Sequence, residues 1–180
     1  MKLFVASDIH GSSYYCKKMM DAYREEKADK MLLLGDLLCH IHQEHLLREY
    51  DPQKVIDLLN EEANDILCVR GHCEENVDPK LLKFPLVAGF CVICIGNRAI
   101  YFSHGHMNAS ELKLPLQEGD IILQGHTHVP KFELISGVYH MNPGSIALPQ
   151  ENSYQGYMTI DENVFTWKDL DGNVVMKQVL

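Results

Sequence analysis

The chain has 180 residues, of which 46% are hydrophobic and 23% are charged, and this composition is ordinary for a folded domain. The net charge of −9 disfavours unspecific nucleic-acid binding, which needs a basic face. No apolar run approaches the ~20 residues of a membrane-spanning helix. The amino-terminal segment becomes polar too early for a secretory signal, so we expect one cytoplasmic domain over residues 1–180.

The first half of the chain alternates between apolar strands and amphipathic helices. The run at 31–34 is apolar without alternation, which is typical of a parallel strand buried on both faces. Pro52 is favoured in the first turn of a helix, where its missing N–H is not needed. We predict strands at 2–7, 31–34 and 66–69, and helices at 11–26 and 52–63. This order is typical of an α/β unit.

From Leu86 onward the pattern changes to short strands separated by turn residues. Only residues 109–116 look helical in this half. We predict strands at 87–95, 99–103, 120–124, 132–135, 138–141, 156–160, 164–168 and 174–179. The two halves together predict an α/β fold in which two sheets pack together with helices outside.

The cysteines do not form two paired Cys-x-x-Cys motifs, which excludes a zinc ribbon. We expect all six to be buried free thiols of a reducing compartment: Cys16, Cys39, Cys68, Cys73, Cys91 and Cys94. This expectation supports the cytoplasm as the location.

Aspartate and histidine residues recur directly after five predicted strands, each time beside a glycine. They are Asp8 and His10, Asp36, His72, His104 and His106, and His126 and His128. In α/β sheets, ligands bind at the carboxyl ends of the strands, and glycines let the backbone turn and approach closely there. An isolated Asp-x-His or His-x-His carries little information, but five such clusters at strand ends indicate a metal site.

Carboxylates mixed with imidazoles suit manganese, iron, cobalt, nickel or zinc. One metal ion would leave some of these ligands unused. Two ions that share a bridging carboxylate would use them all, at the separation of about 3.5–4 Å that is suited to phosphoryl transfer.

The same residues, in the same order, resemble the motifs of the calcineurin-like metallophosphoesterases. The segments 69–74, 125–130 and 142–145 extend the likeness over nearly the whole chain, in particular to the small bacterial phosphodiesterases of the YfcE type. The resemblance implies a four-layer α/β/β/α sandwich and two divalent ions, with Mn2+ expected and Zn2+, Fe2+, Ni2+ or Co2+ as alternatives. It implies these ligands: Asp8, His10 and His128 for one ion, His104, His126 and residue 72 for the other, and Asp36 as the bridge.

Position 72 departs from the family, which usually has asparagine there. We predict that His72 ligates the second metal, because its Nδ1 atom is as many bonds from Cβ as the Oδ1 atom of asparagine. Cys73 follows where many relatives have a histidine that acts on the leaving group. His106 is therefore a candidate for a catalytic or phosphate-contacting role, and a structural hydrogen bond is its alternative.

Several other polar residues receive weaker expectations. Glu74 is expected either to orient His72 or a neighbouring loop, or to be solvated. The turn at 142–145 is expected to support the site. His40, His42 and His45 are expected in an exposed polar loop.

We therefore expect a metal-dependent phosphodiesterase in which activated water attacks a small phosphate ester in line, and in which Asp36 is essential. A phosphomonoesterase remains open. So does a non-catalytic interaction module, as in the retromer subunit of this fold. A nuclease is disfavoured by the negative charge. The relatives and the apolar carboxyl-terminal strands predict a homodimer or a homotetramer.

Overall fold

The computed structural model describes residues 1–38, 47–86, 89–107 and 114–180. Its helices are α1 (Ser13–Glu26) and α2 (Pro52–Glu61), both of which were predicted. The side chain of Ser12 accepts a hydrogen bond from the N–H of Tyr15, and that of Asp51 accepts one from Lys54, so both helices begin at a capping residue. Three short 3-10 turns follow: η2 (Ala63–Asp65), η3 (Cys73–Asn76) and η4 (Pro79–Leu81).

The first sheet has six strands in the order β11-β10-β9-β1-β2-β3. Their bounds are β1 (Lys2–Ala6), β2 (Lys30–Leu33), β3 (Ile66–Cys68), β9 (Gly156–Asp161), β10 (Val164–Asp169) and β11 (Val174–Val179). β1, β2 and β3 are parallel, whereas the other pairs are antiparallel. The sheet thus joins the two ends of the chain.

The second sheet has five strands in the order β4-β5-β6-β8-β7. Their bounds are β4 (Phe90–Ile95), β5 (Arg98–Ser103), β6 (Ile121–Gln124), β7 (Lys131–Ile135) and β8 (Val138–Asn142). β5, β6 and β8 are parallel, so this sheet also has three parallel strands whose carboxyl ends lie at one edge.

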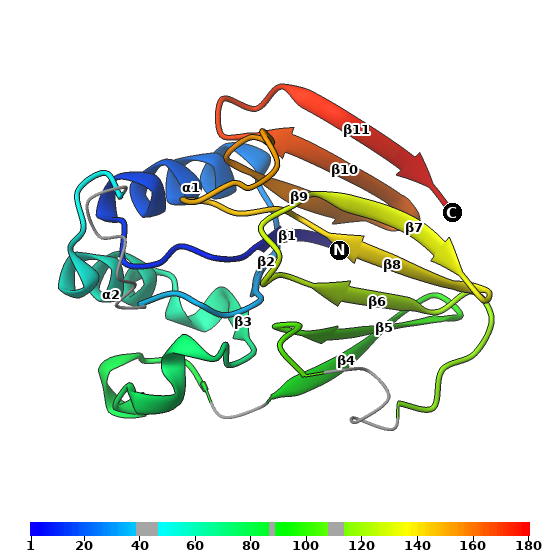
Figure 1. Cartoon of the computed structure of the whole chain (residues 1–180), viewed down its shortest axis with the longest axis horizontal. Helices are drawn as coiled ribbons and strands as arrows, with labels where there is room; N and C mark the ends of the chain where they lie inside the picture. Colours follow the sequence, from blue (N-terminus) through cyan, green and yellow to red (C-terminus); the bar gives the residue numbers. More distant parts are fainter. Residues whose placement is uncertain (39–46, 87–88, 108–113) are drawn as a thin grey trace.

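The two sheets face each other, and α1 and α2 cover the outer face of the first sheet (Figure 1). Successive side chains of β1 alternate between two cores. Phe4 packs in the core under the helices, whereas Leu3 and Val5 pack with Trp167 and other side chains between the sheets. The predicted arrangement of two packed sheets with helices outside is confirmed.

The differences from the predicted elements lie at their ends. β1 ends at Ala6 rather than at residue 7, and the predicted helix at 52–63 ends at Glu61. β4 begins at Phe90, three residues later than predicted. Most of the predicted helix at 109–116 falls on residues 108–113, outside the described ranges, and residues 114–116 are irregular.

The prediction for the cysteines needs correction. Cys16 and Cys68 are buried and free, as predicted. Cys91 and Cys94 are free, but Cys91 is half-buried and Cys94 is exposed, because they lie on alternate positions of β4. Cys73 is disulfide-bonded. Spacing along the chain does not show which thiols the fold brings within bonding distance, so the prediction was wrong for this residue.

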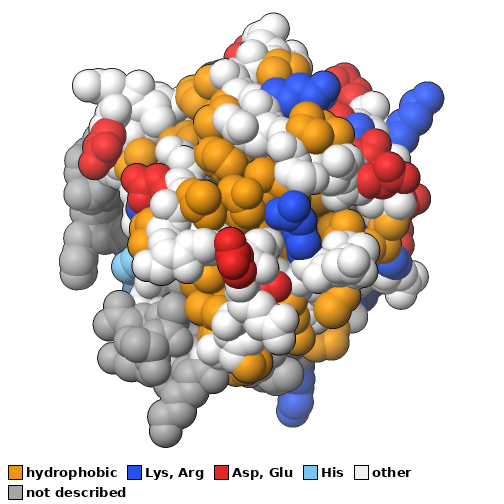
Figure 2. All heavy atoms as spheres, turned by 90° about the vertical axis from the view of Figure 1, so that its right-hand side faces the viewer, with side chains coloured by type: hydrophobic (Ala, Val, Ile, Leu, Met, Phe, Trp, Pro, Cys, Tyr) orange, Lys and Arg blue, Asp and Glu red, His pale blue; other side chains and the backbone are white. Residues whose placement is uncertain are grey.

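Both chain ends lie at the edge of the sandwich from which β1 starts (Figure 1). Met1 and Asn163 line one hollow of about 780 Å³, and the N–H of Leu180 donates to the carbonyl of Asn163 at 3.0 Å. Figure 2 shows hydrophobic side chains gathered on this face. No helix in the described part of the chain is long and apolar enough to cross a membrane.

Candidate metal centre

The predicted site residues come together because the parallel strands of both sheets end at the same side of the molecule. They follow β1 (Asp8, His10), β2 (Asp36), β3 (His72), β5 (His104) and β6 (His126, His128). The loops that carry them are joined by backbone hydrogen bonds, from the N–H of His10 to the carbonyl of Asp36 and from that of Gly125 to His104, both 2.9 Å. Rigid strands therefore set the positions of all seven side chains.

Asp8, His10 and His128 form the first group of potential ligands, with donor atoms within 4.8 Å of one another. The Nε2 atoms of His10 and His128 are 3.2 Å apart. The Oδ1 atom of Asp8 lies 3.6 Å from Nε2 of His10 and 3.3 Å from Nε2 of His128. Three donor atoms thus face one another instead of facing solvent.

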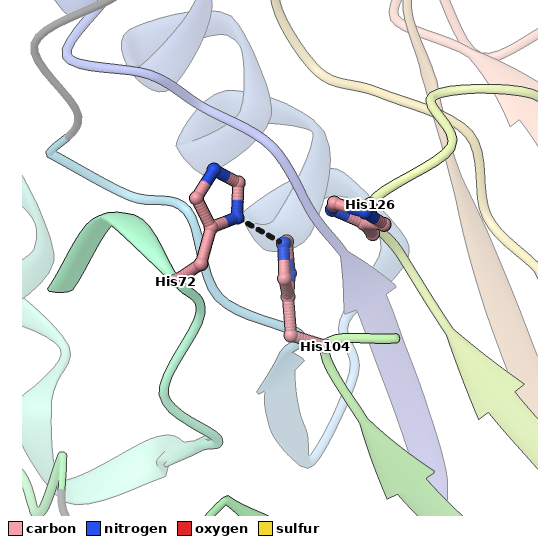
Figure 3. A group of neighbouring side chains, drawn as sticks. All are labelled: His72, His104 and His126. Carbon is pink, nitrogen blue, oxygen red and sulfur yellow. Dashed lines mark hydrogen bonds between the residues drawn. The ribbon is translucent and has the colours of Figure 1, made fainter. Parts of the chain in front are cut away.

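His72, His104 and His126 form the second group, shown in Figure 3. The three rings come from different loops and approach a common space. Nδ1 of His72 is 3.3 Å from Nε2 of His104, so His72 presents the nitrogen expected from the comparison with asparagine. His104 is buried, while His72 and His126 are exposed, which leaves this group open to solvent on one side.

Asp36 lies between the two groups. Its Oδ2 atom is 3.1 Å from Nδ1 of His72 and 3.2 Å from Nε2 of His104. Its carboxylate oxygens are also within 4.8 Å of donor atoms of Asp8 and His10 from the first group, and of His104 from the second. Among the described residues, the other side chains that belong to more than one potential ligand group are those of Asp8, His10 and His104, which adjoin Asp36.

Buried polar atoms that lack hydrogen bonds show that these residues fit metal ions. Within the described residues, Oδ1 of Asp8, Oδ2 of Asp36 and Nδ1 of His10 are buried without a partner. Imidazole nitrogens lie 3.1 to 3.6 Å from these two oxygens. The other oxygens are held by backbone N–H groups, that of Asp8 by His126 and that of Asp36 by Cys73, both at 3.1 Å. Leaving carboxylate oxygens buried and unpaired is costly, and a divalent cation would compensate them.

Two of the imidazoles are fixed in the tautomer that a metal ligand needs. Nδ1 of His104 is 2.8 Å from the carbonyl of Leu34, and Nδ1 of His128 is 2.6 Å from that of Leu148. Because a carbonyl only accepts, each Nδ1 carries the proton and donates it. In the neutral form of each ring, Nε2 therefore carries the lone pair, and it points toward the other potential ligands.

The electrostatics of the centre reflect opposed effects. Burial acts to raise the pKa of Asp8 and of Asp36, but the nearby imidazoles hold both pKa values below the ordinary range. Burial acts to lower the pKa of His104 and His128, but Asp36 and Asp8 respectively raise these pKa values. The carboxylates are thus ionised at neutral pH, ready to bind cations.

Five of the potential ligands have left-handed backbone conformations, with φ between 51° and 66°: Asp8, His10, Asp36, His126 and His128. Residues other than glycine rarely adopt such angles, which cost of order 1 kcal/mol each. They persist only where the surroundings impose them, and they are typical of functional sites.

The turn at 142–145 supports two of these loops, as predicted. The side-chain amide of Asn142 donates to the carbonyl of Gly125 at 2.7 Å and to the hydroxyl of Thr127 at 3.1 Å. The hydroxyl of Ser145 donates to the carbonyl of Asp8 at 2.9 Å. The turn therefore connects the loop after β6 to the loop after β1.

The remaining candidates are placed as follows. The ring of His106 is exposed, with its centroid 5.5 Å from that of His104 and 6.1 Å from that of His72. Glu74 is buried and contacts the backbone near Asp36 rather than His72. His40, His42 and His45 lie outside the described residues.

Comparison with known proteins agrees with this geometry. Residues 1–163 match the calcineurin-like phosphoesterase superfamily domain. The chain is 34% identical to phosphodiesterase YfcE of Escherichia coli strain K12 over 179 residues. The matched region covers 99% of this chain and 97% of YfcE.

Solved structures give the same result. A structure of YfcE, a phosphoesterase from E. coli, matches with a TM-score of 0.92 at 33% identity over 99% of both chains. A Vps29 variant from Entamoeba histolytica shares the fold, with a TM-score of 0.64 at 22% identity over 100% of this chain and 99% of that chain. The expected family is confirmed: the chain belongs to the calcineurin-like phosphoesterase superfamily.

Proposed function

We propose that this protein hydrolyses small phosphodiesters with a dinuclear metal centre. The observation that carries the proposal is the position of Asp36 between two ligand groups, with a buried carboxylate oxygen that lacks a hydrogen-bond partner. The similarity to phosphodiesterase YfcE supports the diester as the substrate class. The site residues proposed as ligands are Asp8, His10 and His128 for one ion, His72, His104 and His126 for the other, and Asp36 for both.

When bound, two divalent ions would activate water as a nucleophile and offset negative charge on the phosphate. Asp36 sets the spacing between the two groups. The backbone carbonyls of Leu34 and Leu148 accept from Nδ1 of His104 and His128, so that Nε2 is the atom of each neutral ring that would ligate a metal ion. The exposed side of the centre, next to His72 and His126, is where a phosphate ester enters.

We propose Mn2+ as the native ion. Mixed carboxylate and imidazole ligands suit it, and Zn2+, Fe2+, Ni2+ and Co2+ are the competitors. The second group has three imidazoles, so His72 favours a metal ion that accepts nitrogen ligands over Mg2+. Elemental analysis of protein purified without added metal tests this assignment.

His106 is proposed to contact the phosphate or to protonate the leaving oxygen. Its exposed ring lies next to those of His104 and His72, on the open side of the centre. A His106→Ala variant should lose rate mainly on substrates with poor leaving groups, which need a proton, and less on 4-nitrophenyl esters. Equal losses on both would instead indicate a phosphate contact.

The decisive experiment compares chromogenic bis(4-nitrophenyl) phosphate with 4-nitrophenyl phosphate, using metal-free protein and protein reloaded with Mn2+. We expect metal-dependent hydrolysis that favours the diester. Asp36→Asn should abolish it, while Asp57→Asn, an exposed aspartate on α2, should not change it. Preference for the monoester would make the protein a phosphomonoesterase. Absence of metal-dependent hydrolysis of either ester would reject the proposal in favour of an interaction module.

Residues 1–180 are proposed to form one domain, because β9, β10 and β11 share a sheet with β1. We place the protein in the cytoplasm on the free thiols of Cys16, Cys68, Cys91 and Cys94, which are typical of reducing compartments. The disulfide at Cys73, in contrast, is typical of oxidising compartments. Recovery from the periplasmic or secreted fraction of the source cells would reject this location.

We also propose a homodimer or homotetramer. Val174, Val175 and Val179 of the edge strand β11 are 58%, 52% and 62% exposed, and such apolar edges are usually covered. Light scattering after gel filtration should give a multiple of the chain mass, and Val175→Lys with Val179→Lys should reduce it. A monomeric wild-type protein at micromolar concentration would reject self-association.

A further inference from the structure

Glu74 makes an unusual set of contacts beneath the metal centre. It lies in η3, directly after the loop that carries His72, and its side chain is only 2% exposed. Its two carboxylate oxygens accept hydrogen bonds from four backbone N–H groups. Oε2 accepts from Asp36 at 2.8 Å and from Gly71 at 2.9 Å, and Oε1 accepts from Leu37 at 2.6 Å and Leu38 at 3.2 Å.

These contacts require the ionised form of the side chain. Each oxygen already receives two N–H donors, and a carboxylate is an acceptor only. A carboxylic acid or an amide would direct a hydrogen toward groups that also donate. Charge-assisted bonds of this kind are stronger than bonds between neutral groups.

The backbone around Glu74 is packed too tightly to accept other arrangements. A Cβ atom on Gly71 would lie 2.2 Å from Oδ1 of Asp36 and 2.8 Å from Oε2 of Glu74. A Cβ atom on Gly35 would lie 2.5 Å from the backbone nitrogen of Gly71. The loops after β2 and β3 are therefore in direct backbone contact, and Glu74 joins them.

Asp36 needs such support, because its φ of 53° is unfavourable for a residue with a side chain. Glu74 accepts one of its four hydrogen bonds from the N–H of Asp36 itself. Two others come from the N–H groups of the next residues, Leu37 and Leu38. The contacts fix the peptide groups on both sides of Asp36, and with them the direction of its carboxylate.

We propose that Glu74 is a positioning residue that holds the Asp36 loop in its left-handed conformation, so that the Asp36 carboxylate faces both ligand groups. The inference rests on the proposed dinuclear centre but goes beyond it, since Glu74 is not a ligand of either ion. It assigns to the residue after Cys73 a role in metal affinity that acts through the backbone.

The test is Glu74→Gln, which keeps the shape of the side chain but turns an –NH2 group toward two N–H donors. We expect the affinity for Mn2+, measured by calorimetric titration of metal-free protein, to fall by about 10- to 100-fold. At saturating Mn2+, kcat on the diester should fall while KM changes little, because substrate still reaches the same open face. Unchanged Mn2+ affinity would overturn the inference.

Asp120→Asn is the matched control. Asp120 is also buried, and it accepts backbone N–H groups of Ala99 at 3.1 Å and Gln117 at 2.8 Å, but it precedes β6, at the opposite end from the centre. This variant should be less stable than wild type with unchanged Mn2+ affinity. A comparable loss of affinity in Asp120→Asn would show that any buried carboxylate has the same effect and would reject the role of Glu74.

A double-mutant cycle tests whether Glu74 acts through Asp36. In an Asp36→Asn background, Glu74→Gln should weaken the remaining Mn2+ binding far less than in the wild-type background. Full additivity would overturn the inference. If Glu74→Gln does not fold, Glu74→Asp takes its place, since it keeps the charge but is too short to reach all four N–H groups, and it should also weaken Mn2+ binding.

The outcomes separate this inference from the proposed function. Wild-type protein that binds two ions and cleaves the diester, together with an unaffected Glu74→Gln variant, would reject only the role of Glu74. Wild-type protein that binds no ions would reject both.

Discussion

At the scale of single residues, the centre combines conformations and charges that are unfavourable without a bound cation. Asp36 has a left-handed backbone, is buried, and keeps one carboxylate oxygen without a hydrogen bond. Such features reduce stability and persist where activity requires them.

Replacement of Asp36 by asparagine should therefore separate stability from activity. Asparagine tolerates the left-handed conformation better, and its amide can donate toward Nδ1 of His72 and Nε2 of His104. We expect metal-free Asp36→Asn protein to be more stable than metal-free wild type by about 1 kcal/mol at pH 8.5. Urea unfolding in EDTA measures this difference, and a less stable variant would contradict the argument.

His72→Asn should change which metal ions the centre prefers. The variant replaces a nitrogen ligand with an oxygen ligand, so Zn2+ affinity should fall about tenfold or more relative to Mg2+ affinity. Competition titrations with the two ions measure the ratio. An unchanged ratio would show that His72 does not contact the metal.

At this scale, the sequence predicted which aspartate and histidine side chains the structure brings together, but not all of their contacts. Asp8, His10 and His128 could be selected because each follows a strand and stands near a glycine. The contacts of Glu74 could not be predicted, because they depend on how closely the loops after β2 and β3 approach, which the local pattern does not contain. The prediction of a free thiol at Cys73 was wrong for the same reason.

At the scale of elements, the sequence predicted the strands well but did not predict their order in the sheets. Apolar runs and turn residues gave β5, β6 and β10 within one residue at each end. The position of β9 beside β1 could not be predicted, because pairing between the two ends of the chain leaves no local signal.

A partly buried polar cluster at the end of α1 fixes this distant pairing. Glu26, the last residue of α1, accepts from Lys2 at 2.6 Å, from Lys168 at 2.5 Å and from Tyr157 at 2.8 Å. Burial acts to raise the pKa of Glu26, but the two ammonium groups and the phenol lower it from 4.5 to about 2. The cluster links α1 to β1, β9 and β10.

Glu26→Gln should consequently lower stability in a pH-dependent way. Because its pKa is lower in the folded state, Glu26 contributes stability above its ordinary pKa, and this contribution is lost as pH falls from 4.5 toward 2. We expect a loss of about 1–2 kcal/mol at pH 7 that shrinks at pH 3. Urea unfolding at both pH values checks it, with exposed Glu25→Gln as control; a loss that does not depend on pH would contradict this reasoning.

At the scale of the whole molecule, the centre joins the two sheets. Asp8, His10 and Asp36 belong to loops of the first sheet, and His104, His126 and His128 belong to loops of the second. A bound ion would therefore hold the sheets together at one edge.

Metal removal should lower the stability of the entire fold. Protein with Mn2+ at 100 times its dissociation constant should be more stable than metal-free protein by about 2.7 kcal/mol for each site. Thermal unfolding of the whole chain, monitored by circular dichroism in Mn2+ and in EDTA, measures this difference in stability. The increase should be much smaller for Asp36→Asn, and an equal increase would mean that the ion binds elsewhere.

The shared location of the two chain ends has a practical consequence. Met1 and Leu180 both lie next to Asn163, at the amino end of β1, whereas the side chains of the candidate metal centre follow its carboxyl end. An enzyme anchored to a support through either terminus would thus keep its reactive edge facing the solution. The same layout would let a fluorescent carrier or an affinity handle be attached without crowding incoming esters.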